Sequence, residues 1–135
     1  MERVSDIEKA IGAHVHWVSW LREAVINTFT AQTRFDIDQI RSVEGCDFGK
    51  WLESCQWMVR DPGNHWYVKI RRLHAEFHET SARIVEQAMS GNLLKAYSLL
   101  YGDLLTISGR MVIALRAWQT ELLTQIWWQQ NSVDH

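Results

Sequence analysis

The sequence predicts an all-α fold from its composition and from the helical spacing of its apolar residues. The chain has 135 residues, of which only one is proline and seven are glycine. So few breaking residues favour long helices over the many turns that a β-fold needs. Hydrophobic residues make up 47% and charged residues 22% of the chain, as in soluble globular domains. A chain of this length can bury one core, so we expect one domain over 1–129 and a short tail over 130–135.

A first helix is predicted over residues 4–29. Apolar residues recur there at spacings of three and four, which places them on one narrow stripe of a helix. The stripe consists of Ile7, Ile11, Val18, Leu21 and Val25. His14 also falls within it, whereas His16 lies on the opposite side with Lys9. Helical phase therefore predicts that His14 faces inward and that His16 faces solvent.

Two shorter elements are expected after this helix. Residues 30–45 have mixed polarity and weak periodicity, so we expect a connecting segment that contains a short turn of helix near 37–41. A short helix is predicted over 46–58, where the apolar residues again recur at helical spacing. These apolar residues are Phe48, Trp51 and Leu52.

A third helix is predicted to end near Ser90. The preceding residues 60–64, Arg-Asp-Pro-Gly-Asn, indicate a turn, because Asp and Asn cap helices and proline is tolerated in a first helical turn. Gly91 and Asn92 are typical of a helix end. Its inward face consists of Tyr67, Ile70, His74, Phe77, His78, Ser81 and Val85, and its outward face carries Arg72, Glu76, Glu79 and Arg83.

A last helix is predicted over 93–129. Its apolar residues approach a seven-residue repeat, which is typical of a four-helix bundle or of a dimer seam. They are Tyr97, Leu100, Leu104, Ile107, Met111, Ala114 and Trp118. Trp127 and Trp128 either pack back on the bundle or are buried in a second subunit, since aromatic residues are enriched at interfaces. We expect a four-helix-bundle-like domain with an additional short helix, which forms a homodimer.

Charge and hydropathy exclude several classes of partner and location. The formal net charge of −2 does not provide the basic surface that nucleic acid needs. No run of about eighteen uncharged apolar residues occurs, and no apolar block follows the N-terminus. We therefore expect a cytoplasmic chain that does not insert into membranes. In that compartment the two cysteines favour thiols or metal ligands over a disulfide.

Histidines on the predicted inward faces indicate a metal site. His74 and His78 are four residues apart on one helix face, so their imidazoles can reach the same metal ion. The alternative is a pair of core histidines that are satisfied by hydrogen bonds. The apolar character of the face favours a metal, because two imidazoles there would otherwise leave polar nitrogens unsatisfied. His14 adds a third inward imidazole from the first helix.

Cys46 is the candidate thiol ligand. It stands at the N-terminus of the predicted short helix, where the dipole and the exposed amides favour the thiolate that zinc prefers. Cys55 lies nine residues further on, on the other side of the helix and about 13 Å away along its axis. Cys55 can therefore neither share the metal nor form a disulfide with Cys46. We expect it to be a small core residue.

These residues, taken in order, resemble the signature of a known family. The motifs are His14-x-x-Trp17, Cys46-x-Phe48-Gly49-x-Trp51 and His74-x-x-x-His78. Together they closely resemble the chemoreceptor zinc-binding (CZB) domain, which is found in bacterial chemoreceptors and at the N-terminus of zinc-regulated diguanylate cyclases. The resemblance implies a helical bundle in which His14, Cys46, His74 and His78 jointly bind Zn²⁺. It also implies that Trp17 and Trp51 pack around the site and that Gly49 allows helices to approach closely.

The resemblance further implies a cytoplasmic regulatory module, often dimeric, that controls diguanylate cyclase activity or chemotaxis. Four protein ligands fill a tetrahedral zinc shell, whereas hydrolytic zinc sites keep a position for water. We therefore expect a sensor rather than an enzyme, which responds to zinc itself or to oxidants that attack Cys46. The alternatives are a metal-independent helical dimerisation module, a di-iron oxygen carrier, and a nucleophile pair of Cys46 with a histidine.

Overall fold

The computed structural model of the chain describes residues 2–43, 46–55 and 65–132, and every regular element in these ranges is helical. The elements in chain order are α1 (Glu2–Thr30), α2 (Ile37–Arg41), α3 (Asp47–Ser54), α4 (His65–Met89), α5 (Leu93–Ser98), the π-helical segment η2 (Leu99–Leu104) and α6 (Leu105–Ser132). The predicted all-α class is confirmed, as is the short helix at Ile37–Arg41.

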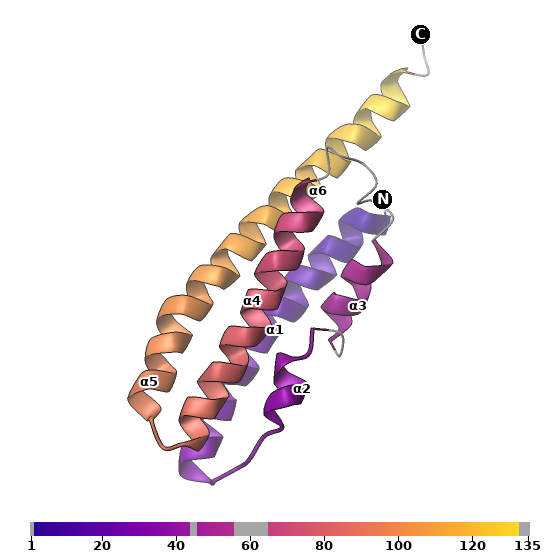
Figure 1. Cartoon of the computed structure of the whole chain (residues 1–135). Helices are drawn as coiled ribbons and strands as arrows, with labels where there is room; N and C mark the ends of the chain where they lie inside the picture. Colours follow the sequence, from indigo (N-terminus) through magenta and orange to yellow (C-terminus); the bar gives the residue numbers. More distant parts are fainter. Residues whose placement is uncertain (1, 44–45, 56–64, 133–135) are drawn as a thin grey trace.

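The bundle consists of three long helices, with two short helices in the place of a fourth (Figure 1). α1, α4 and the continuous helix of α5, η2 and α6 lie side by side, and each packs against the other two. The two short helices α2 and α3 follow one another along the remaining side, where α2 packs on α4 and α3 contacts both α1 and α4. Successive members of the bundle run in alternating directions. This is the four-helix-bundle-like arrangement that the sequence predicts, with the two short helices in the second position.

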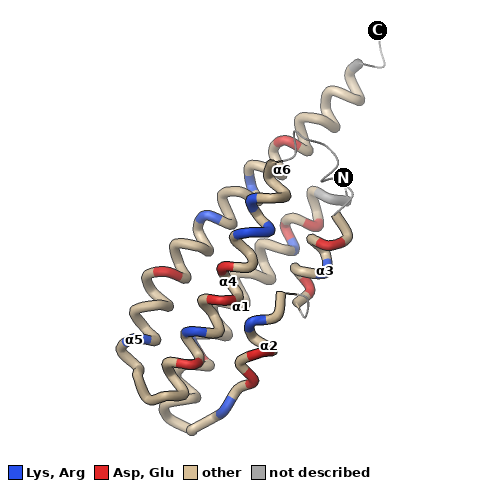
Figure 2. Tube along the Cα trace, in the orientation of Figure 1, with Lys and Arg blue, Asp and Glu red and all other residues tan. Residues whose placement is uncertain are grey.

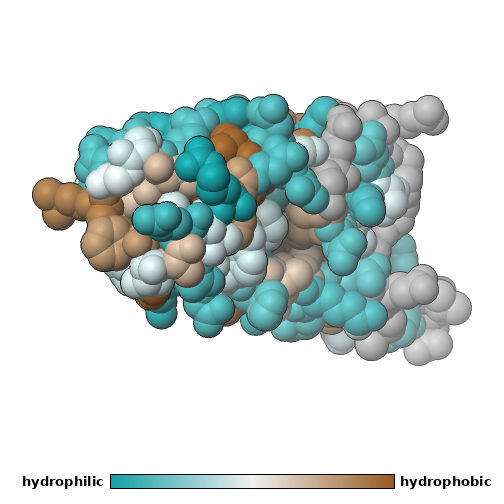
Figure 3. Space-filling view, turned by 90° about the horizontal axis from the view of Figure 1, so that it is seen from below, coloured by the Kyte–Doolittle hydropathy of each residue, from teal (hydrophilic) through white to brown (hydrophobic). Residues whose placement is uncertain are grey.

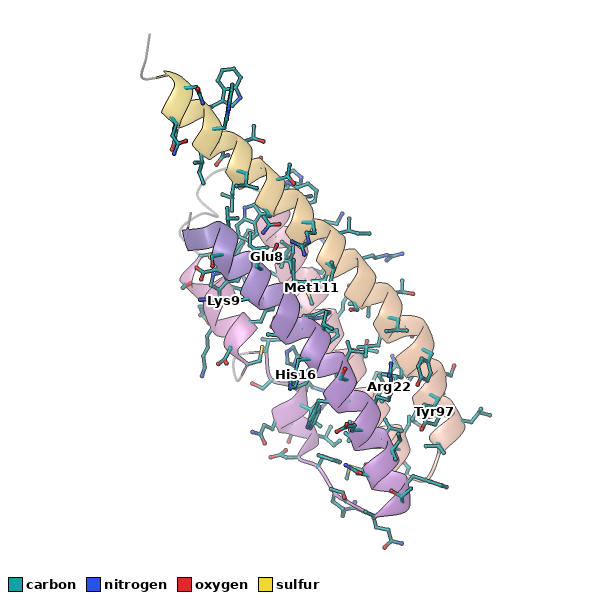
Figure 4. All side chains as sticks on the ribbon, turned by 180° about the vertical axis from the view of Figure 1, so that it is seen from behind. Glu8, Lys9, His16, Arg22, Tyr97 and Met111 are labelled. Atoms are coloured by element: carbon teal, nitrogen blue, oxygen red, sulfur yellow. The ribbon has the colours of Figure 1, made fainter. Side chains whose placement is uncertain are left out.

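The inward and outward faces of α1 and α4 agree with the predicted helical phase. His14 is buried in the same face as Ile7 and Leu21, whereas His16 is exposed. Every residue of the predicted inward face of α4 is buried, including His74 and His78. Figure 4, which views the bundle from behind, shows α1 and α6 side by side, with Glu8 on α1 and Met111 on α6. Glu8 accepts a hydrogen bond from Arg116 of α6. The core therefore lies between the long helices, with the histidines inside it.

The helix ends have specific caps. The side chain of Asp36 accepts hydrogen bonds from the first backbone amides of α2, and the side chain of Asn92 does the same for α5. Gly91 ends α4 with φ +84°, and the amides of Gly91 and Asn92 bond back to the carbonyls of Ala88 and Gln87. This is a Schellman motif, in which glycine avoids the steric penalty of left-handed backbone.

Some predicted boundaries differ, and some predictions lie outside the described residues. The last helix, predicted over 93–129, continues to Ser132, so residues 130–132 of the predicted tail are helical. The helix predicted over 46–58 is observed over Asp47–Ser54, and Cys55 is its C-terminal cap. Residues 56–58 and the predicted turn over 60–64 are not described by the structure. Cys55 is buried, as expected for a small core residue.

The last helix differs from the sequence expectation in its middle. Instead of a regular α-helix with a seven-residue repeat, the segment Leu99–Leu104 has π-helical hydrogen bonding. Most residues of the predicted stripe are buried, whereas Tyr97 and Ile107 are only half-buried. A π-turn holds more residues than an α-turn. It therefore rotates all the residues that follow around the helix axis.

The continuous helix over Leu93–Asn131 is also the most apolar element of the described chain. It contains an 18-residue window of mean hydropathy 1.3, so by length and composition alone it is able to cross a membrane. The core helix of a soluble protein has the same property, and α6 supplies Met111, Leu115 and Trp118 to the core. Viewed from its lower end, the bundle has a mainly hydrophilic surface with scattered hydrophobic side chains (Figure 3).

Candidate metal centre

Three potential ligands meet where α3 faces α4. One donor atom from each of Cys46, His74 and His78 lies within 4.8 Å of the other two. The Sγ of Cys46 is 3.3 Å from Nε2 of His74, and the rings of His74 and His78 are nearly perpendicular with centroids 4.6 Å apart. Both histidines are buried and Cys46 is half-buried. A shared ion is thus within reach of all three side chains.

Cys46 owes its orientation to its place at the start of α3. It is the N-cap of this helix, and its Sγ accepts a hydrogen bond from the amide of Gly49 at 3.2 Å. The thiol also donates towards the carbonyl oxygen of Val43, 3.6 Å away. An N-cap side chain points back over the first turn. This geometry directs the sulfur towards His74 on the neighbouring helix.

His78 is oriented by a backbone group of α2. Its Nδ1 lies 2.7 Å from the carbonyl oxygen of Ile40. Because a carbonyl only accepts hydrogen bonds, Nδ1 must carry the proton, and the lone pair of His78 is then on Nε2. Metal-binding histidines usually donate their other N–H in this way, which fixes both the tautomer and the ring orientation. The predicted short helix at Ile37–Arg41 therefore has a direct role at the site.

His14 lies in the wall of the same cavity but outside the group of three. The cavity has a volume of about 450 Å³ and is lined by all four predicted ligands. The ring of His14 packs on Phe77 at 4.1 Å between centroids, and its Nε2 is 2.9 Å from Oγ of Ser108 in α6. The structure thus brings Cys46, His74 and His78 together and places His14 beside them. Its part in a complete ligand shell stays a prediction.

Aromatic side chains enclose the histidines. Trp17 packs on His78 with centroids 5.1 Å apart and donates its Nε1–H to Oγ of Ser81. Phe48 lies edge-on against His74 at 4.6 Å. Trp51 stacks on Phe48 and is not among the residues that line the cavity. Trp17 therefore borders the site directly, whereas Trp51 supports it through Phe48.

Gly49 is required by a close backbone approach. A Cβ atom at this position would overlap the carbonyl oxygen of Val43 and would lie 3.3 Å from Cε1 of His74. The absence of a side chain lets α3 approach both the preceding segment and α4. The same glycine donates the amide hydrogen bond to Cys46. Two features of the ligand geometry thus depend on it.

Burial controls the protonation of the histidines. It lowers the pKa of His14 to about 4 and that of His74 to about 3, with a further decrease from the neighbouring imidazoles. The pKa of His78 is also lowered by burial, although its bond to Ile40 opposes the shift. All three rings are therefore neutral at pH 7. Neutral imidazole is the form that binds metals.

The protonation of Cys46 differs from the sequence expectation. Burial raises the pKa of its thiol, and this effect outweighs the hydrogen bonds from the amides of Gly49 and Phe48, which lower it. The helix N-terminus alone therefore does not produce a thiolate in the metal-free protein. A coordinated metal ion deprotonates a thiol through its own charge.

The donor set fits zinc. One sulfur and two or three neutral imidazoles, from elements far apart in sequence, are the ligands of structural and regulatory zinc sites. Two neighbours of the histidines were missed in the sequence, namely the carbonyl of Ile40 and the hydroxyl of Ser108. A backbone carbonyl has no sequence signal, and a serine in a long helix resembles any other half-exposed polar residue.

Replacing Gly49 should disturb the site more than the fold. We expect Gly49→Ala to destabilise the protein by about 1–3 kcal/mol, because overpacking forces backbone shifts, and to weaken zinc binding at least tenfold. The matched control is Gly12→Ala in α1, where a Cβ meets nothing within 4 Å. This control should be neutral or stabilise by up to about 1 kcal/mol. Urea unfolding and zinc titration measure both effects, and equal behaviour of the two variants would contradict the packing argument.

The buried histidines should make the metal-free protein sensitive to acid. The pKa of His74 is below its unfolded value of 6.5, so its neutral form stabilises the fold above pH 6.5, and this stability is lost as pH falls towards the folded pKa. Linkage gives about 1.4 kcal/mol per pH unit for each such histidine. Urea unfolding with a chelator present should show a shallower slope between pH 6.5 and 4 for His74→Gln than for wild type. His16→Gln, at an exposed position, should keep the wild-type slope; an unchanged slope in His74→Gln refutes the assignment.

Comparison with known proteins agrees with this geometry. A family model of the chemoreceptor zinc-binding domain matches residues 14–85, which is more than half of the chain and includes all four predicted ligands. No curated protein and no solved structure matches the chain. The match begins at His14 and continues past His78, so it covers the three motifs that carry the resemblance. The chain belongs to the chemoreceptor zinc-binding (CZB) domain family.

Proposed function

We propose that this protein is a zinc-dependent sensory domain that regulates a signalling partner. The observation that carries the proposal is the convergence of Cys46, His74 and His78, with donor atoms within 4.8 Å of one another. A zinc ion held there supplies a cross-link between α3 and α4, and His14 would extend that link to α1. CZB domains are regulatory rather than catalytic, and a shell of four protein ligands leaves no position for a reacting water.

The site has two inputs to which it is able to respond. Zinc concentration would act through occupancy, because the ligands come from separate helices and are drawn together by the ion. An oxidant would act through Cys46, because oxidation to a sulfenic acid weakens the sulfur as a ligand. Cys46 is half-buried and also caps α3. Loss of the thiolate would therefore remove both a ligand and a helix cap.

The output is proposed from the family and from the shape of the bundle. The final turns of α6 project beyond the ends of α1 and α4 (Figure 1). A projecting helix is suited to transmit a change in bundle packing to a partner domain, such as a diguanylate cyclase or a chemoreceptor signalling region in the cytoplasm. We do not expect binding to nucleic acid or insertion into a membrane.

Metal analysis tests the proposal directly. We expect wild type and Cys55→Ala to bind one zinc per chain and Cys46→Ala to lose most of its affinity, because only Cys46 faces the histidines. Hypochlorous acid or peroxide should release zinc from wild type and Cys55→Ala, but not from Cys46→Ala loaded at higher zinc concentration. Zinc titration at a fixed redox state should shift thermal stability if zinc itself is the signal. A wild-type protein that binds no zinc would overturn the proposed function.

A second copy of the chain is the proposed partner of the α6 tip. This tip is the part of α6 after Glu121, which carries no charged residue as far as Ser132 (Figure 2). Trp127 and Trp128 are 56% and 62% exposed there, so they do not pack back on the bundle in this single chain. A projecting apolar surface of this kind also supports the alternative of a metal-independent dimerisation module. The two functions differ in whether zinc is bound.

Sedimentation measures the proposed dimer. We expect wild type to sediment as a dimer. A Trp127→Ala/Trp128→Ala double variant should dissociate at least tenfold more readily, because buried aromatic anchors contribute most of the binding energy of an interface. Val68→Ala removes an exposed apolar side chain from α4 and should leave the dimer intact. A monomeric wild type contradicts the dimer, and a dimer without zinc in wild type favours the metal-independent module.

A further inference from the structure

Each buried histidine of the centre is held by a different structural element. His78 donates from Nδ1 to Ile40 in α2, and His74 presents Nε2 to the sulfur of Cys46 at the start of α3. His14 has its Nε2 2.9 Å from the Oγ of Ser108 in α6. Ser108 lies beyond the residues that the family model matches, so no motif of the family predicts this third contact.

We propose that Ser108 is a positioning residue for His14, which it holds through Nε2 so that Nδ1 is the nitrogen that binds the metal. This inference rests on the proposed zinc function. An imidazole has two nitrogens, and a metal ligand needs one of them with a free lone pair. With Nε2 engaged by the serine hydroxyl, Nδ1 is the donor that remains. His14 and His78 therefore use opposite nitrogens.

Among the described residues, Ser108 is the hydrogen-bond partner of His14. Its ring packs on Phe77 and is 4% exposed, so rotation of the imidazole is limited by packing as well as by Ser108. A buried imidazole that lacked the serine would have one nitrogen without a hydrogen-bond partner in the metal-free protein. The hydroxyl both donates and accepts, so it is able to satisfy Nε2 in either tautomer, and metal binding at Nδ1 selects the one in which Nε2 donates.

The π-helical segment explains why Ser108 reaches His14. Ala96, Leu100 and Leu104 are buried at successive spacings of four, and Ser108 continues this series. In a regular α-helix at 100° per residue, twelve residues would turn Ser108 about 120° away from Ala96. The wider turns over Leu99–Leu104 remove much of this rotation. The irregular segment thus sets the phase that places the Ser108 hydroxyl at the histidine.

Through the bond between His14 and Ser108, the ligand shell is connected to the helix whose end projects from the bundle. The other three predicted ligands lie at the N-cap of α3 and on α4. Ser108 is therefore the contact through which the position of the metal-bound imidazole is linked to α6.

The test compares three single variants of the full chain. Ser108→Ala removes the hydroxyl, Ser108→Thr retains it, and Thr106→Ala removes a hydroxyl of the same helix that bonds to the carbonyl of Gly102 on the exposed side. Loss of a group that orients a metal ligand typically weakens metal affinity by about 10–100-fold. We expect this loss in Ser108→Ala only, with the other two variants within about threefold of wild type in chelator competition.

Nitrogen NMR of the imidazoles gives an independent readout that a merely structural role of Ser108 would not alter. In zinc-loaded wild type, the proton of His14 should be on Nε2 and that of His78 on Nδ1. In metal-free Ser108→Ala, His14 should lose its hydrogen-bonded Nε2 signal while His78 is unchanged.

The outcomes separate the inference from the proposed function. If wild type binds no zinc, the zinc function itself fails. If wild type binds zinc but Ser108→Ala binds it equally well, or if His14 is metallated at Nε2, the positioning role is overturned. Tighter zinc binding by Ser108→Ala also overturns it, because His14 would then have to leave the serine in order to reach the metal. Thermal unfolding of the metal-free variants establishes that each is folded before these comparisons are made.

Discussion

The burial of three imidazoles and a thiol between α1, α3 and α4 is the constraint on which the rest of the structure depends. Buried polar nitrogens need a hydrogen bond or a metal, and no buried side-chain nitrogen or oxygen in the described residues lacks a partner. The partners come from three further contacts, namely the Ile40 carbonyl, the Ser108 hydroxyl and the Cys46 sulfur. Satisfying the histidines therefore fixes how α2, α6 and α3 lie against the two helices that carry them.

Features with a local cause were predictable from the sequence. Helical phase placed His14 inside and His16 outside, since a shift of two residues rotates a side chain by about 200° around the axis. The same rule separated the buried from the charged face of α4, and the low content of glycine and proline gave the helical class. Cys46 was predicted as a ligand from its place at a helix N-terminus and, together with Gly49, from their motif. The structure adds the contacts that these residues make, namely the hydrogen bond from the amide of Gly49 to the sulfur of Cys46 and the close approach of Gly49 to the Val43 carbonyl.

Features that arise from packing between distant segments were not predictable. The raised pKa of Cys46 results from burial, which overrides the local effect of the helix N-terminus. The π-helical hydrogen bonds over Leu99–Leu104 replace a pattern that reads as a regular seven-residue repeat. Ser108 is separated from His14 by 94 residues. Nothing in the sequence around either residue indicates that the other is its partner, because their contact depends on the phase of α6 and on its place beside α1.

The hydrogen bonds of the histidines also determine what loss of a ligand would do. In small zinc fingers the ion holds the fold together, so that the metal-free chain unfolds. Here a core with Trp118 and Phe77 is built from long helices, and each histidine has a partner within the protein. We therefore expect the metal-free bundle to stay folded. Loss of the metal should mainly loosen α3, which has eight residues, two buried side chains and Cys46 as its N-cap. Such short elements open at lower free energy than long core helices. A local and reversible response of this kind is what a regulatory site requires.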